Sequence, residues 1–196
     1  MWFQERRNKP LNIIMKMFTN IVWPELVVVV IIIALILAKF KLTVFNFFFY
    51  SSFMTYFMMI LKASFREARP YFVNTDIKPL QKYAEYGNPS GHVLLGYVVV
   101  SYLFDEFVYA HPCWTSCNVE EDHVCKGNKH GKYHWKKYAK QILHFFVVAM
   151  IFISRMYLGM HSFNQCLFSL ICGIYCHLMY NAYFKDKIRT VINLSM

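Results

Sequence analysis

The sequence predicts an all-α membrane protein, a polytopic bundle of about five transmembrane helices, and three observations support this. First, the 196 residues are 57% hydrophobic and only 16% charged, which is more apolar surface than one soluble domain of this length normally buries. Second, five runs with few or no charges approach the roughly 20 residues that a helix needs to cross the hydrocarbon core. Third, Trp, Tyr and Lys residues flank these runs, as is typical of helix ends at a membrane interface.

The five expected spans follow one another along the chain. They are residues 21–38, 42–61, 93–110, 141–153 and 162–184. The second span is uncharged throughout, whereas the third acquires Asp105 and Glu106 only near its end. The fourth is short and leads directly into Ser154 and Arg155. The third and fourth runs span the bilayer if their ends reach the interface.

The spans divide the chain into three parts. Residues 1–20 carry scattered charge and lack a signal-peptide cleavage site, so we expect them to form an N-terminal interfacial segment. Residues 21–184 form the transmembrane domain, which includes a polar loop at 111–138. Residues 185–196 are expected to be a C-terminal tail.

The net charge of +10 points to a membrane surface as the partner and not to nucleic acid, because the basic residues are spread between apolar runs. Alternation across five spans places 11 of the 21 Lys and Arg residues on the side of the loop 111–138. The other side has 10, three of which are assigned to chemistry below. The positive-inside rule then favours a cytoplasmic loop 111–138 and a luminal or extracellular position for the opposite side. The sequence does not indicate an oligomeric state.

Three short blocks place cations and histidines at the ends of expected spans. Residues 62–70 end the second span, residues 89–92 open the third, and residues 154–161 join the fourth to the fifth. Charged groups at these depths cost several kcal/mol unless they are paired or lie at the interface, so their presence needs a reason. Alternation puts all three blocks on one face of the membrane.

The residue types in these blocks suit a bound phosphate. Lys62, Arg69 and Arg155 supply positive charge, and the two guanidinium forks match pairs of phosphate oxygens. Ser90 and Gly91 begin a helix, where backbone amides and the Ser90 hydroxyl can meet an anion.

Two histidines remain for covalent chemistry and proton transfer. A neutral imidazole can attack phosphorus, and a second imidazole that titrates near neutral pH can protonate the leaving alkoxide. His92 and His161 are the candidates.

The three blocks read Lys, six residues, Arg-Pro; then Pro-Ser-Gly-His; then Ser-Arg, five residues, His. This pattern resembles the signature of the type 2 phosphatidic-acid phosphatase and haloperoxidase superfamily, and the resemblance covers about residues 42–184. It implies a metal-independent, cofactor-free phosphatase of lipid phosphates, polyprenyl diphosphates or glucose 6-phosphate that forms a phosphohistidine. It also implies that His161 is the nucleophile and that His92 is the acid and later the base. The phosphate would be held by Lys62, Arg69, Ser90, Gly91 and Arg155.

The residue four places after His161 departs from the family pattern. The family usually has Asp there, to accept the Nδ1 proton of the nucleophile, and this chain has Gln165. A glutamine carbonyl can fix the tautomer but carries no negative charge to stabilise a cationic ring. We therefore expect the Gln165 carbonyl to accept the Nδ1 proton of His161 in place of the Asp carboxylate. A lower phosphatase activity than that of family members with Asp is the alternative that this replacement leaves open. A second departure is the span count, since six spans are usual in lipid-phosphate members.

The loop 111–138 carries a set of Cys and His residues whose spacing matches no familiar zinc finger, so no metal is expected and zinc stays an alternative. They are Cys113, Cys117, His123, Cys125, His130 and His134.

Together these observations predict an integral-membrane phosphatase of a lipid phosphate or polyprenyl diphosphate. The expected location is an endomembrane such as the endoplasmic reticulum, with a site open to the lumen or exterior. One alternative is a sugar phosphatase similar to glucose-6-phosphatase, suggested by Gln165. The other is a weak or inactive homologue that serves as a structural subunit of a membrane complex, suggested by Gln165 and the reduced span count.

Overall fold

The structure is a computed structural model that describes residues 5, 7–20, 41–109 and 130–195. Every regular element in these ranges is helical, which confirms the predicted all-α class. The elements are α2 (Lys9–Asn20), α4 (Lys41–Phe65), α5 (Pro70–Val73), α6 (Gly91–Leu103), η1 (Phe104–Tyr109), α8 (His130–Tyr157), α9 (Phe163–Met179), η2 (Tyr180–Phe184) and α10 (Lys185–Ser195).

The chain is an integral membrane protein. Three described segments are long and apolar enough to cross a bilayer, namely Thr43–Val73, Tyr138–Tyr157 and Phe163–Ile188. They correspond to the second, fourth and fifth expected spans. The third expected span is α6 continued by the π-helix η1. The first, residues 21–38, lies outside the described residues.

The helices reach further than the hydrophobic runs. α4 continues to Phe65 and α8 to Tyr157, so Lys62 and Arg155 lie in the last turns of long helices. α8 also begins at His130, within the stretch expected to be polar loop. Hydropathy detects only the part of a helix that lies in hydrocarbon, and these helices extend beyond it.

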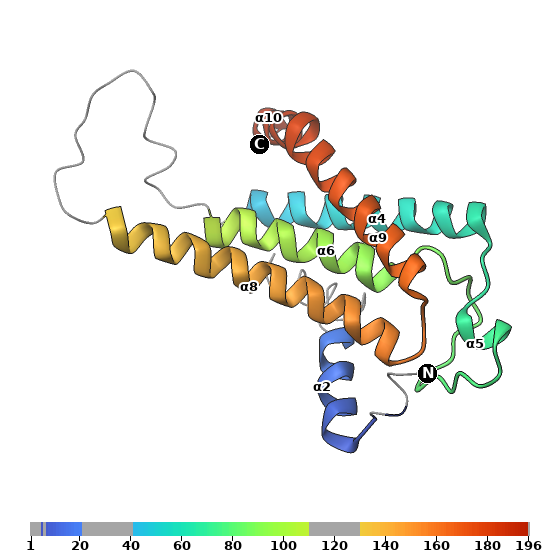
Figure 1. Ribbon diagram of the computed structural model, residues 1–196. Helices are drawn as coiled ribbons and strands as arrows, with labels where there is room; N and C mark the ends of the chain where they lie inside the picture. The colour runs from blue at the N-terminus through green and yellow to red at the C-terminus, as the bar shows by residue number, and fades with distance from the viewer. Residues whose placement is uncertain (1–4, 6, 21–40, 110–129, 196) are drawn as a thin grey trace.

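α6 is the central helix of the bundle. It packs against α4, α8 and α9, and Figure 1 shows it running between α4 and α8 while α9 crosses it. Almost every side chain from Val93 to Tyr102 is buried, as expected for a helix that is apolar all round. α9 approaches closely because of Gly173, where an added Cβ would lie 3.3 Å from the carbonyl oxygen of Leu94. This packing fixes the start of α6, with its Ser90–His92 segment, relative to α9.

α2 lies across one end of α8 (Figure 1). Met15 packs with Tyr157, Leu158 and Met160, which connect α8 to α9. Arg7 donates a hydrogen bond of 2.8 Å to the Tyr157 carbonyl. The N-terminal segment therefore packs directly on the turn that carries His161; that it lies in the membrane interface stays a prediction.

Candidate active site

The three sequence blocks meet at one end of the bundle, where α4 ends, α6 begins and α8 turns into α9 (Figure 1). The sequence analysis expected them on one face. In the structure Arg69 Nη1 lies 3.2 Å from His161 Nε2, and His92 is close enough to Lys62, Arg69 and Arg155 to interact with them electrostatically. Six of the eight candidate residues are buried polar or charged side chains, and five of them are Lys62, Arg69, Ser90, Arg155 and His161. Gln165 is buried as well, and Gly91 and His92 are partly exposed.

The ring of His161 is held at both nitrogens. Nδ1 lies 2.8 Å from the carbonyl oxygen of Gly87, and Nε2 lies 3.2 Å from Nη1 of Arg69. A carbonyl oxygen only accepts and a guanidinium only donates, so the proton sits on Nδ1 and the lone pair on Nε2. Gly159, at φ +74°, provides the left-handed turn that brings the ring to this place. The lone pair on Nε2 therefore faces the guanidinium of Arg69.

His161 is neutral at neutral pH. Burial, followed by the positive charges of Arg155 and Arg69, holds the pKa of His161 well below its ordinary value of 6.5. A neutral imidazole keeps the Nε2 lone pair that nucleophilic attack requires.

Arg155 and Ser90 have polar atoms that nothing in the described protein satisfies. Arg155 is 1% exposed, and its Nε and Nη1 have no hydrogen-bond partner. Ser90 Oγ is also buried without a partner, apart from the weakly bonding Cys166 thiol beside it. Burying a charged group whose N–H donors have no acceptor costs several kcal/mol of folding free energy. An anion that reaches these atoms removes that cost.

The expected contribution of the Ser90 amide needs a correction. The Ser90 N–H donates to Ser169 Oγ at 2.5 Å, so this amide already has a partner within the protein. The Ser90 hydroxyl makes no helix-capping bond at the start of α6. Within this block, the hydroxyl is thus the group left for an anion, together with the backbone at Gly91.

Lys62 and Arg69 are held by a residue that the sequence analysis missed, Glu85. Lys62 Nζ pairs with Glu85 Oε2 at 2.5 Å, and Arg69 Nε donates to the Glu85 carbonyl at 2.8 Å. The hydrogen bond from Lys62 lowers the pKa of Glu85, which keeps this carboxylate ionised. A lone Glu in an irregular loop has no motif that would have singled it out.

Gln165 does not contact Nδ1 of His161 as the sequence analysis expected, because the Gly87 carbonyl takes that place. Ser162 caps α9 and forms a capping box with Gln165, which draws the side chain back toward the start of the helix. From there Gln165 Nε2 donates to the Ala68 carbonyl at 2.9 Å and to Glu67 Oε1 at 3.0 Å. Gln165 thus ties the segment after α4 to the start of α9.

Gly87 fits closely between these groups. A Cβ there would lie 2.8 Å from Gln165 Nε2 and 3.1 Å from the Ala68 oxygen, so a side chain at this position would displace the Gln165 amide. Gln165 therefore packs behind the residue whose carbonyl orients His161. We therefore expect Gln165 to act as a positioning residue.

We predict that Gln165→Glu lowers kcat about tenfold with little change in KM, since altering a group that orients a catalytic residue typically costs 10- to 100-fold. The new carboxylate would face Glu67 and the Ala68 carbonyl without a proton to donate. If Gln165 were instead the Nδ1 acceptor, the added negative charge would raise kcat. Gln165→Leu, which removes both bonds, provides the matched control and should lose at least as much. Steady-state kinetics of the folded variants distinguishes these outcomes.

His92 stands at the start of α6 and is close enough to Arg155, Lys62 and Arg69 to interact electrostatically with all three. It also interacts with His161. The two imidazoles and the three cations thus surround one region. Among the described residues, no group of three His, Cys, Asp or Glu side chains is placed to hold a metal ion. Cys113, Cys117, His123 and Cys125 lie outside the described residues, so the zinc alternative stays a prediction.

Comparison with known proteins identifies the family of the chain. The family model of the PAP2 superfamily matches residues 26–189. No curated protein matches the chain. Among solved structures, one described as the "first transmembrane PAP2 type phosphatidylglycerolphosphate phosphatase from Bacillus subtilis" aligns with a TM-score of 0.66 at 17% identity, covering 92% of this chain and 80% of that one. That likeness shows a shared fold. With most of its length matched by the family model, the chain belongs to the PAP2 superfamily, whose members are phosphatases.

Proposed function

We propose that this protein hydrolyses a lipid phosphate or a polyprenyl diphosphate, through a phosphohistidine at His161 and without a metal. The observation that carries the proposal is the buried guanidinium of Arg155, whose Nε and Nη1 lack partners within the described residues. These donors lie near a neutral histidine whose lone pair is aimed at a second guanidinium. A tetrahedral anion supplies the missing acceptors.

Phosphate binding uses groups from three segments of the chain. Arg155 contributes two donors, Ser90 a hydroxyl, and Arg69 the Nη1 donor that now rests on His161 Nε2. Once a phosphoryl oxygen takes over that donor, the lone pair is free for attack. The Lys62 ammonium group is paired with Glu85 and also attracts the bound phosphate. Preorganised cations of this kind stabilise the charge that develops in the transition state.

The reaction then proceeds in two displacements. Nε2 of His161 attacks phosphorus, the P–O bond to the leaving group breaks, and His92 protonates the departing alkoxide. The ring becomes cationic, and its Nδ1–H donates more strongly to the Gly87 carbonyl. His92, now neutral, takes a proton from water, which attacks phosphorus and breaks the P–N bond. Inorganic phosphate leaves and both histidines return to their starting state.

A lipid substrate is supported by the setting of the site. The site lies at the end of membrane-spanning helices, and the aromatic side chains of α4 such as Phe49, Phe53 and Tyr56 are exposed, as they would be toward lipid. The protein of the same fold named above acts, by its printed description, on a lipid phosphate. We place the site on the luminal or exterior side of an endomembrane, such as the endoplasmic reticulum, from the distribution of Lys and Arg.

The sugar-phosphatase and inactive-homologue alternatives both drew on Gln165 as a replaced proton acceptor. Because Gln165 contacts Ala68 and Glu67 instead, it favours neither of them.

The test is phosphate release by purified protein in detergent with EDTA. We expect the wild type to hydrolyse at least one of phosphatidate, a sphingoid-base phosphate and a polyprenyl diphosphate, and to prefer it over glucose 6-phosphate. His161→Ala should fall to background on every substrate. Equal background release by both proteins would identify a non-enzyme, and a preference for glucose 6-phosphate would overturn the lipid assignment.

A further inference from the structure

Arg155 and His161 lie on either side of one helix end, so the geometry of that end decides how the two side chains face each other. The Met160 amide donates to the Arg155 carbonyl at 3.1 Å. The Gly159 amide donates to the Met156 carbonyl at 2.9 Å. These two bonds, with the positive φ of Gly159, form a Schellman motif that ends α8.

The Schellman bonds do not involve the carbonyls of Tyr157 and Leu158, and these two oxygens accept from other parts of the chain. The Leu158 carbonyl accepts from the Leu80 amide at 3.1 Å. The Tyr157 carbonyl accepts from Nη2 of Arg7 at 2.8 Å, and the guanidinium carbon lies 5.8 Å from the centroid of the Tyr157 ring. A cation suits this place, because the last carbonyls of a helix need donors and form the negative end of its dipole. Arg7 thus completes the cap of α8 from 150 positions away in the sequence.

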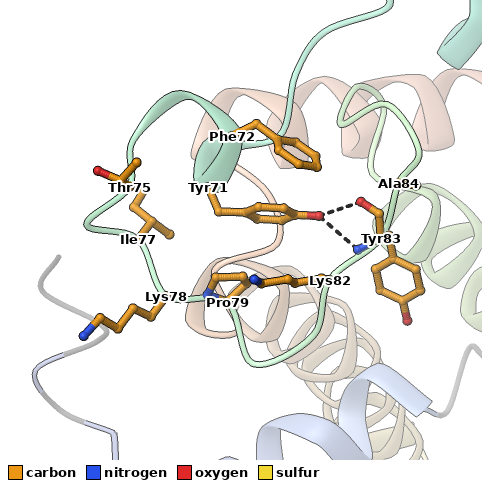
Figure 2. Close-up of a pocket in the computed structure, with 9 residues that line it drawn as sticks. All are labelled: Tyr71, Phe72, Thr75, Ile77, Lys78, Pro79, Lys82, Tyr83 and Ala84. Atoms are coloured by element: carbon orange, nitrogen blue, oxygen red, sulfur yellow. Dashed lines mark hydrogen bonds between the residues drawn. The ribbon is translucent and has the colours of Figure 1, made fainter.

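The same guanidinium holds the loop that follows α5. Nη1 of Arg7 donates to the Lys78 carbonyl at 2.5 Å. Figure 2 shows Lys78 in this loop between Ile77 and Pro79. A Cβ on Gly159 would lie 3.3 Å from Arg7 Nη2 and 3.4 Å from Ile77 Cγ2. The N-terminal segment, the loop and the end of α8 therefore pack closely against one another.

The loop after α5 reaches the other side of His161. The Tyr71 hydroxyl donates to the Tyr83 carbonyl at 2.7 Å and accepts from the Tyr83 amide at 3.0 Å, as Figure 2 shows. The Tyr83 ring centroid lies 5.3 Å from the guanidinium carbon of Arg69, which contacts Nε2 of His161. Arg7 therefore joins the turn that carries His161 to the loop that packs on Arg69.

Polar contacts from α2 keep Arg7 in place. Asn12 Oδ1 accepts from the Tyr157 hydroxyl at 2.7 Å. Thr19 Oγ1 lies 3.1 Å from Ser154 Oγ, and both side chains are buried. α2 is thus fixed to the last turn of α8, and Arg7 precedes it.

We infer that Arg7 is a positioning residue of the reaction. By capping α8 and tying it to the loop, Arg7 holds Arg155 and His161 where both meet the same phosphoryl group. It acts through these residues and lies outside the three sequence blocks. The inference rests on the proposed phosphatase function and adds a residue to that same site.

The first test compares the kinetics of Arg7→Met with those of Lys9→Met, which removes an exposed cation of α2 nearby. For Arg7→Met we expect kcat on a lipid phosphate to fall about tenfold or more with little change in KM, since small misplacements of reacting groups cost up to about 10²-fold. Lys9→Met should match the wild type. Wild-type kcat in a folded Arg7→Met protein, or an equal loss in Lys9→Met, would overturn the inference.

A second variant keeps the charge of Arg7 but not its fork. A lysine at this position cannot donate to the Tyr157 and Lys78 carbonyls at once, so kcat of Arg7→Lys should still fall severalfold. This variant retains the cation at the end of α8 and serves if Arg7→Met fails to fold. An Arg7→Lys protein with the kcat of the wild type would show that the double contact is not needed.

The last test measures binding without turnover, so that the two proposals can fail separately. Vanadate mimics the five-coordinate transition state and needs His161 and Arg155 in place together, whereas inorganic phosphate is held by the cations without a bond to His161. Calorimetry should therefore show that Arg7→Met weakens vanadate about tenfold and phosphate much less.

Each outcome of this titration bears on one proposal or on both. A selective loss of vanadate affinity supports the role of Arg7 even if the wild type hydrolyses no lipid. Equal losses for both anions, or none, reject that role, and hydrolysis by the wild type then leaves the phosphatase function in place. A wild type that binds neither anion rejects both proposals.

Discussion

Replacing Arg155 by methionine is expected to lower kcat/KM by about 10³-fold while raising the melting temperature of the ligand-free protein. The two effects have one cause. Arg155 is 1% exposed, and its Nε and Nη1 donors have no acceptor. The buried cation therefore lowers the stability of the protein as long as no anion is bound. A methionine of similar length removes that cost and also removes the phosphate contact. The rise in melting temperature should amount to a few degrees, corresponding to about 1 kcal/mol.

Arg155→Lys separates charge from geometry. A lysine keeps the positive charge but loses the guanidinium fork, so an intermediate activity is expected. Inorganic phosphate or vanadate should raise the melting temperature of the wild type and leave that of Arg155→Met unchanged. If Arg155→Met lowers the melting temperature and phosphate still stabilises the variant, then Arg155 is a packing residue and not a phosphate ligand.

His92→Ala is expected to lower turnover of a lipid phosphate by about 10³-fold, because the alkoxide then leaves without a proton. With p-nitrophenyl phosphate, whose leaving group needs no proton, the first displacement should persist while hydrolysis of the P–N bond slows. Stopped-flow measurement should then show a burst of p-nitrophenol about equal to the enzyme, followed by slow release. His144→Ala, a histidine outside the site, is the matched control and should show steady turnover without a burst.

A linear trace from His92→Ala at normal rate on both substrates would show that His92 is not the acid and base. A loss of both steps together on p-nitrophenyl phosphate would instead assign His92 to phosphate binding.

The cations and histidines of the site could be predicted from the sequence because each lies at the end of a span. Helix ends of similar spans lie at the same depth, so alternation alone places Lys62, His92 and Arg155 on one face. The matching signature then assigned roles to them. The contact between Arg69 and His161 agrees with that placement.

The groups that orient these residues could not be predicted in the same way. The Nδ1 acceptor of His161 is the backbone carbonyl of Gly87, and a carbonyl has no sequence signature. Glu85 and Glu67 lie in segments without periodicity, so nothing in the sequence indicated that they bond to Lys62 and Gln165. Gln165 was misassigned because its spacing from His161 suggested a contact, whereas the Ser162 capping box turns the side chain elsewhere. Local helix-end geometry decided this position.

The most direct measurement of the central claim is to map the phosphorylated residue. His92→Ala protein is quenched during the burst with a ³²P-labelled substrate, digested, and analysed by mass spectrometry under alkaline conditions that preserve phosphohistidine. We predict one acid-labile phosphate per chain on His161, and none in the His92→Ala, His161→Ala double variant. Label on another residue, or turnover by a single displacement with no covalent label, would contradict the claim that His161 is the nucleophile.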